Sequence, residues 1–136
     1  MNTFSKTIDL IHRGLDTASV RSGVIANNIA NAEVPNFKRQ EVNFESQLRR
    51  ALDSKSQVPV VELKRTDSRH FSNYNPLDYR DVRPRRVMDY LSTSKNNGNN
   101  VDAEQEVQLW VQNQMMYSLL ANSAAFHFSQ INSVLR

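Results

Sequence analysis

The stretch that decides the fold spans residues 101–135, which read VDAEQEVQLWVQNQMMYSLLANSAAFHFSQINSVL. Positions spaced alternately four and three residues apart, from Ala103 to Leu135, are apolar with the single exception of Gln114. This spacing places them along one side of an α-helix, as a seam that packs against another helix. We therefore predict a C-terminal helix with a coiled-coil seam. The seam residues are Val107, Trp110, Tyr117, Phe128, Ile131 and Leu135.

The remaining surface of this helix carries no charge between Val107 and Leu135. A helix that faces bulk water normally carries charges on its outer side. The amides are too numerous for a membrane span, whose centre penalises polar side chains. An uncharged polar face suits either a helix packed against other protein copies or one that lines a narrow aqueous channel, and both interpretations stay open. The candidate channel-facing residues are Gln105, Gln108, Gln112, Asn122 and Ser129.

A second helix with the same rhythm is predicted near the N-terminus, over residues 5–32. Its apolar row is broken only by Ser22, and at 1.5 Å per residue it would be roughly 42 Å long. Because the seven-residue repeat persists for several turns at both ends of the chain, we predict that the two terminal helices form one antiparallel coiled coil. Two ordinary amphipathic helices in a small bundle are the alternative. The N-terminal seam residues are Phe4, Ile8, Ile11, Leu15, Ile25 and Ile29.

Pro35 and Asn36 are expected to end the N-terminal helix. Pro35 fixes its own φ and disfavours the helical conformation at Val34. Proline at the second position and asparagine at the third fit a type II turn, because asparagine tolerates positive φ. The pair is either a plain helix stop or a junction at which the chain leaves the coiled coil at a fixed angle.

The middle of the chain is expected to be irregular. It should contain a short helix over about residues 43–53 and one or two short strands, near 58–63 and 87–91. Asp102 is the expected N-cap of the C-terminal helix, and Glu104 and Glu106 are favoured there by the helix dipole. The predicted fold is mainly α, with helical segments at 1–35 and 101–136 that flank a junction and irregular region at 36–100.

The composition suits one soluble domain, with 136 residues of which 39% are hydrophobic and 23% charged. The chain has no cysteine, so it has neither a thiolate metal site nor a cysteine nucleophile. The histidines, at positions 12, 70 and 127, are interpreted as packed or surface residues rather than as metal ligands. No phosphate-binding glycine loop and no nucleophile elbow is present. We predict no enzymatic activity, no catalytic or metal-binding residue, and no cofactor.

A basic segment supports one alternative function, that of a nucleic-acid-binding module. Basic residues together with aromatic residues are typical of such surfaces. Asp81 and the modest net charge of +3 count against it, and we predict no nucleic-acid partner. A soluble cytoplasmic coiled-coil adaptor is the other alternative. The segment comprises Tyr79, Arg80, Arg83, Arg85, Arg86 and Tyr90.

Two motifs resemble the bacterial flagellar axial proteins, the family of rod, hook and hook-associated proteins. The first is Asn28-Ile29-Ala30-Asn31 followed by Pro35-Asn36-Phe37-Lys38, which is similar to the family's Asn-Ile-Ala-Asn, two residues, Thr-Pro-Gly-Tyr-Lys. The second is Asn97-Gly98-Asn99-Asn100-Val101-Asp102, followed by Gln112-Asn113-Gln114 and Tyr117. The first motif departs from the family at Val34, Asn36 and Phe37. A chain of this length cannot hold the large inserted domain of hook and distal rod proteins, so it resembles the proximal rod proteins.

This resemblance implies a structural subunit of the proximal rod of the flagellar basal body. Such subunits assemble helically into the drive shaft that transmits torque and surrounds the export channel, with the C-terminal helix innermost. The implied partners are copies of the chain itself, other rod proteins, the adaptor protein and membrane (MS) ring, and the flagellar type III export apparatus. The implied location is the periplasm, reached without a cleaved signal peptide; Met1 to Leu15 has no basic region followed by an unbroken apolar core.

Overall fold

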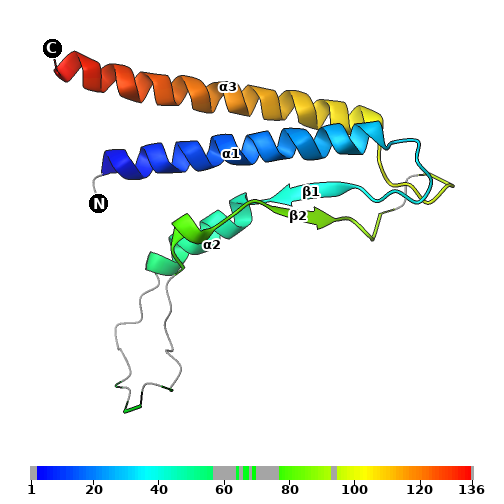
Figure 1. Cartoon of the computed structure of the whole chain (residues 1–136), viewed down its shortest axis with the longest axis horizontal. Coiled ribbons are helices and arrows are strands. Elements are labelled where there is room, and N and C mark those ends of the chain that lie inside the picture. The colour runs from blue at the N-terminus through cyan, green and yellow to red at the C-terminus, as the bar shows by residue number, and fades with distance from the viewer. Residues whose placement is uncertain are drawn as a thin grey trace. The chain divides into compact units, whose positions relative to one another are not determined.

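The computed structural model of the chain describes residues 3–56, 64, 66–67, 69, 77–92 and 95–135. The elements that follow one another along the chain are α1 (Thr3–Ala30), β1 (Gln40–Asn43), α2 (Glu45–Ser56), the 3-10 turn η1 (Tyr79–Asp81), β2 (Arg85–Met88) and α3 (Ala103–Val134) (Figure 1). They fall into two compact units, Met1–Val42 with Arg86–Arg136, and Asn43–Arg85. The predicted mainly α fold, with long terminal helices, is confirmed. Residues 36–42 and 86–100, at the two ends of the predicted middle region, belong to the same unit as α1 and α3.

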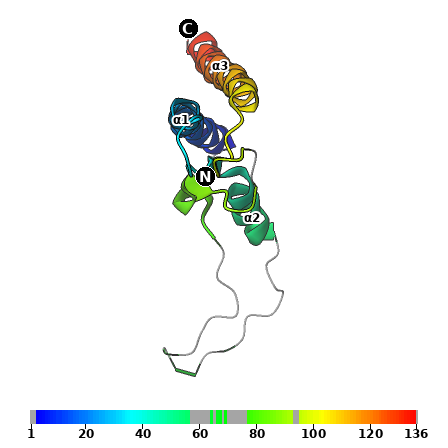
Figure 2. The same cartoon turned by 90° about the vertical axis from the view of Figure 1, so that its right-hand side faces the viewer.

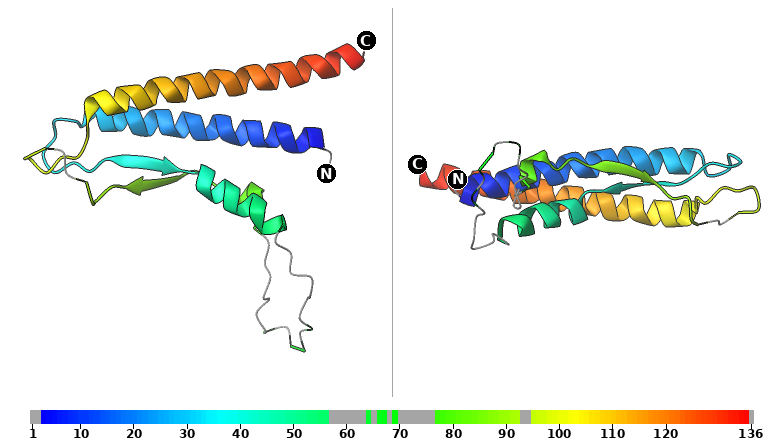
Figure 3. Two further views of the ribbon diagram at one scale, coloured as in Figure 1. Left: turned by 180° about the vertical axis from the view of Figure 1, so that it is seen from behind. Right: turned by 90° about the horizontal axis from the view of Figure 1, so that it is seen from below.

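Helices α1 and α3 pack against each other and run in opposite directions (Figures 1 and 3), as predicted. A column of apolar residues seven positions apart is buried along α1 and the turn that follows it, and each of its isoleucines contributes roughly 1.5–3 kcal/mol when fully buried. The column comprises Ile11, Ala18, Ile25 and Ala32, whose exposed fractions are 7%, 2%, 4% and 6%.

Helix α3 turns a different face to α1 from the one that its apolar spacing predicted. Val107, Trp110 and Tyr117 are 50%, 43% and 44% exposed, and Phe128 and Leu135 are also exposed, whereas Ile131 is half-buried. The buried residues of α3 are instead Glu106 and Asn113. Because these two polar residues occupy the contact face, the apolar pattern pointed to the neighbouring face, one residue further along the helix.

Strands β1 and β2 pair in a two-stranded antiparallel sheet (Figures 1 and 3). Beyond the end of β2, the amide of Asp89 donates to the carbonyl of Arg39 at 2.9 Å. β2 begins two residues before the predicted strand at 87–91. β1 was not predicted, because its sequence, Gln-Glu-Val-Asn, has a single apolar residue. The other predicted strand, at 58–63, lies outside the described residues.

The second unit contains α2, which confirms the predicted short middle helix, and η1, which packs against it (Figure 2). The hydroxyl of Ser54 accepts a hydrogen bond from the amide of Leu77 at 3.1 Å and so joins the end of α2 to the segment before η1. Asp78 caps η1 by accepting from the amide of Arg80 at 3.1 Å. Ala51 and Tyr79 are buried.

The two glycines of α1 have different environments, which predicts different responses to alanine. A Cβ at Gly23 would meet nothing within 4 Å, whereas a Cβ at Gly14 would lie 2.9 Å from Cδ1 of Leu120. Gly23→Ala should therefore raise the free energy of unfolding by about 0.5–1 kcal/mol through helix propensity. Gly14→Ala should gain nothing, because Leu120 must move. Urea unfolding of the purified chain, followed by circular dichroism, measures both; a larger gain for Gly14→Ala would contradict the close approach of α1 and α3.

Candidate functional site

The two sequence motifs meet where α1 ends and α3 begins. We call this region, residues 28–41 with 95–106, the helix junction. The amide of Asn36 donates to the carbonyl of Asn97 at 3.0 Å, and the Lys38 ammonium donates to the carbonyl of Gly98 at 2.8 Å. The amide of Arg39 donates to Oδ1 of Asn100 at 2.6 Å. The N-terminal motif and the asparagine-rich loop are therefore two sides of one hydrogen-bonded structure.

Asn99 caps the end of α1 from the other side of the junction. Its side-chain nitrogen donates to the carbonyl oxygens of Asn31, Ala32 and Val34 at 2.9, 3.0 and 2.8 Å. The last carbonyls of a helix lack partners within the helix, so a donor supplied from elsewhere stabilises its end. The Asn99 side chain is fully buried, and its oxygen accepts from the amide of Val101 at 2.7 Å.

The turn after α1 has the predicted conformation at Asn36. Asn36 has a φ of 59°, which confirms the positive value expected there, and the amide of Phe37 donates to the carbonyl of Val34 at 3.3 Å. Gly98, across the junction, also has positive φ, and a Cβ there would lie 2.6 Å from Oδ1 of Asn36. The loop therefore approaches the turn so closely that a side chain at position 98 does not fit.

Substitutions at Asn36 should separate the need for positive φ from the need for the side chain. Asn36→Gly should be tolerated, because glycine adopts positive φ without strain. Asn36→Val should lower the free energy of unfolding by about 1–3 kcal/mol, since a β-branched residue is strained in this conformation. Urea unfolding of both variants tests this expectation. Equal stability of the two would mean that the left-handed conformation at position 36 is not what the turn requires.

Asn28 ties α1 to β1. Its side-chain nitrogen donates to the carbonyl of Gln40 at 2.8 Å, and its oxygen accepts from the amide of Gln40 at 3.0 Å. The side-chain amide thus pairs with a backbone peptide as a neighbouring strand would. The same nitrogen also donates to the carboxylate of Glu106 at 3.0 Å, and Asn28 is fully buried.

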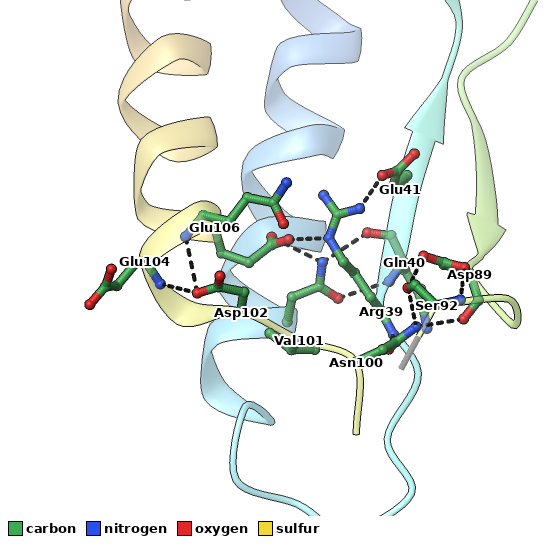
Figure 4. Close-up of polar contacts among 12 residues, drawn as sticks. Arg39, Gln40, Glu41, Asp89, Ser92, Asn100, Val101, Asp102, Glu104 and Glu106 are labelled. Carbon is green, nitrogen blue, oxygen red and sulfur yellow. Dashed lines mark hydrogen bonds and ion pairs between the residues drawn. The ribbon is translucent and has the colours of Figure 1, made fainter. Parts of the chain in front are cut away.

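Glu106 is a buried carboxylate that sequence analysis had assigned only to the helix dipole. Figure 4 shows it directed at Arg39, whose guanidinium also reaches the exposed Glu41. Burial alone would lower the pKa of Arg39, but its hydrogen bonds to Glu106 and Glu41 outweigh burial and raise that pKa. The guanidinium therefore stays charged and compensates Glu106, as a buried carboxylate requires.

A smaller polar cluster holds the other side of the loop. The side-chain nitrogen of Asn100 donates to the carbonyl of Asp89 at 2.8 Å and to the hydroxyl of Ser92 at 3.2 Å. The hydroxyl of Ser92 in turn donates to the Asp89 carboxylate (Figure 4). This hydrogen bond, with those from the amides of Ser92 and Leu91, lowers the pKa of Asp89. Asn100 therefore links the loop to the segment that follows β2.

The structure places the other predicted site residues as follows. Ile11 and Ile25 of the N-terminal seam are buried, Phe4, Ile8 and Leu15 are half-buried, and Ile29 is 36% exposed. The channel-facing candidates all lie on the exposed surface of α3; they are Gln105, Gln108, Gln112, Asn122 and Ser129.

In the described parts of the chain no group of three or more histidine, aspartate and glutamate side chains is placed to hold a metal ion. None of the helices described is both long enough and apolar enough to cross a membrane. An open pocket of about 210 Å³ lies beside the junction, lined by apolar residues that include Ile25, Val42 and Leu109 and by charged residues that include Arg21, Arg39 and Glu106.

Comparison with known proteins identifies the family. The profile of the family described as "Flagella basal body rod protein" matches residues 12–38, which cover most of α1 and the turn after it. The chain is 47% identical to the flagellar basal body rod protein FlgB of Borreliella burgdorferi, over 100% of both chains. It is 46% identical to FlgB of Borrelia hermsii, also over 100% of both. It is 33% identical to FlgB of Bacillus subtilis, over 99% of this chain and 97% of that relative. A chain that matches these relatives along its whole length, with the rod-protein motif built into its helix junction, belongs to the FlgB family of flagellar basal body rod proteins.

Proposed function

We propose that the chain is a structural subunit of the proximal rod, which assembles helically around the export channel and transmits torque. The observation that carries this proposal is the outer surface of α3. It exposes large apolar side chains among amides and hydroxyls, with no charge from Val107 to Leu135. The exposed apolar residues of the helix are Val107, Trp110, Val111, Met115, Met116, Tyr117, Leu119, Phe126, Phe128 and Val134.

A surface of this kind is suited to contact with other subunits. Large exposed apolar patches mark protein interaction sites, and an open helical assembly needs two different faces on each copy. The hairpin of α1 and α3 offers one face on each helix. The C-terminal seam residues that are exposed here, such as Trp110 and Phe128, are then buried between copies. The family match and this surface favour a rod subunit over a cytoplasmic coiled-coil adaptor and over a nucleic-acid-binding module.

Further partners follow from the same proposal. Other rod proteins would continue the shaft beyond the copies of this chain, and the adaptor protein and MS ring would hold its base. Export by the flagellar type III apparatus would deliver the chain to the periplasm without a cleaved signal peptide. Support for these partners and this location comes from the family that the chain belongs to.

The amide-bearing face of α3 is the proposed channel wall. A channel that conducts unfolded chains of any composition should neither bind them nor repel them. Charged walls would hold segments of opposite charge, whereas amides and hydroxyls offer only hydrogen bonds that water already satisfies. Gln108, Gln112 and Asn122 are exposed and uncharged, which fits this requirement. Packing of the same face against neighbouring subunits is the competing interpretation.

Deletion of the gene and complementation in the source bacterium test the proposed role as a rod subunit. Deletion of the gene should leave basal bodies with a membrane ring and no rod, as seen by electron cryotomography, and the unsubstituted chain should restore the rod. A complete rod in the deletion strain would contradict the proposed function.

The channel wall is tested in the same strain with three lysines, at Gln108, Gln112 and Asn122 together. The channel interpretation expects a rod that forms but exports later subunits slowly, with a dependence on the charge of the cargo. Serine at the same three positions is the neutral control and should export normally. If the lysine chain forms no rod while the serine chain does, the face is a packing surface.

A further inference from the structure

Four of the α3 residues that contact α1 are spaced seven positions apart, Glu106, Asn113, Leu120 and His127. The side-chain nitrogen of Asn28 donates to the carboxylate of Glu106 at 3.0 Å. Gly14 leaves the space that Leu120 fills, and the rings of Phe4 and His127 lie edge to face with centroids 6.0 Å apart. Asn113 lies between Glu106 and Leu120 in this series. The regular interval means that a shift of α3 by one heptad would bring each of these residues to the place of the next.

Asn113 lies in the second of these layers and is 4% exposed. Its side-chain nitrogen donates to the carbonyl of Ala18 and to the hydroxyl of Ser22, both at 2.8 Å. Its side-chain oxygen is buried and has no hydrogen-bond partner among the described residues. A buried polar atom without a partner is unfavourable, so an apolar residue of similar size would stabilise this layer at least as well.

The four layers differ in a way that makes them non-interchangeable. A carboxylate faces an asparagine, an amide faces a carbonyl and a hydroxyl, an isobutyl group faces a glycine, and an imidazole faces a phenyl ring. If α3 slid by one heptad toward the start of α1, Asn113 would face Gly14, which offers its amide no side-chain partner. Glu106 would leave Asn28 and Arg39 at the same time. A single buried asparagine is known to select one register in coiled coils, at a cost in stability.

We propose that Asn113, with Glu106, is a positioning residue that selects one axial register between α1 and α3. In the proposed rod both helices present faces to neighbouring copies, so that a shifted hairpin would displace one of its two faces along the axis. The displacement is about 10.5 Å for seven residues at 1.5 Å each. This consequence rests on the proposed function, whereas the register itself is a property of the single chain.

Asn113→Leu tests the proposal directly, because a leucine at 113 would take the place of Leu120 beside Gly14 in the shifted register. Ala26 and Asn132, both exposed, are replaced by cysteine and spin-labelled. The distance between the two labels, measured by pulsed electron paramagnetic resonance, reports the register. The chain has no cysteine of its own, so these are the sole labels. The labels lie near opposite ends of the hairpin, so a one-heptad shift changes their separation by about 10 Å.

The unsubstituted chain should show one distance. The comparison is made in a background with Glu106→Ala and Asn99→Ala, because Glu106 and Asn99 also hold the start of α3 against the end of α1. In this background Asn113→Leu should keep its helix content by circular dichroism and show a second population at a distance about 10 Å longer, whereas the background with Asn113 should show one distance. Gln112→Leu, an exposed neighbour, adds the same side chain outside the contact face and should keep one distance in the same background. A single distance with Asn113→Leu in this background, loss of its helices, two distances in the background with Asn113, or a second population with Gln112→Leu would each overturn the proposal.

Discussion

Glu106→Ala is expected to lower the free energy of unfolding of the chain by about 3 kcal/mol, as removal of one member of a buried ion pair typically does. The loss arises because Arg39, whose side chain is 11% exposed, would keep its charge without the buried partner. Asn28 would also lose an acceptor within a buried site. Urea unfolding followed by circular dichroism measures this loss.

Glu104→Ala is the matched control for that experiment. Glu104 lies two residues earlier on the same helix and is exposed, and it is favoured there by the helix dipole. Its replacement should lower the free energy of unfolding by less than about 1 kcal/mol. Similar losses for the two alanine variants would mean that burial of Glu106 and its pairing with Arg39 contribute little.

Asn99→Ala is expected to cost about 2–3 kcal/mol, because a fully buried side chain loses the hydrogen bonds that it donates to three carbonyls just after α1. The side chain reaches Asn31, Ala32 and Val34 and is fully buried. The same substitution removes the acceptor for the amide of Val101, which lies 2.7 Å from it. Hydrogen exchange at the amide of Val101 should therefore accelerate together with the loss of global stability.

Asn96→Ala provides the comparison within the same loop. Asn96 is an exposed asparagine three residues before Asn99, and its replacement should change the free energy of unfolding by no more than about 0.5 kcal/mol. If Asn96→Ala and Asn99→Ala behaved alike, the composition of the loop, rather than the cap at the end of α1, would explain its effect.

Local chemistry along the chain was sufficient for several features. Pro35 and Asn36 indicated where α1 ends and that Asn36 has positive φ, because the constraints of proline and asparagine act within one turn. Asp102 was identified as the N-cap of α3, and its carboxylate accepts from the amides of Glu104 and Gln105. The seven-residue repeat predicted two long helices packed against each other. These features depend on neighbours within a few residues, which the sequence displays directly.

The contact face of α3 could not be predicted in the same way. Apolar periodicity indicates a buried face only when that face is apolar, and here Glu106 and Asn113 occupy it. Their burial is favourable because partners from α1 and from the segment before β1 complete their hydrogen bonds. Those partners lie 67 to 95 residues away in the sequence, so no pattern among neighbouring residues indicates them.

The sequence by itself therefore determined the helices, the turn that ends α1, the cap that begins α3, and the resemblance to flagellar axial proteins. Tertiary structure alone decided which face of α3 meets α1, that Gln40–Asn43 forms a strand, and that Asn99 caps a helix it does not belong to. The reason is physical: short-range preferences act through the backbone of adjacent residues, whereas a buried polar group is stable only where the fold supplies its distant partner.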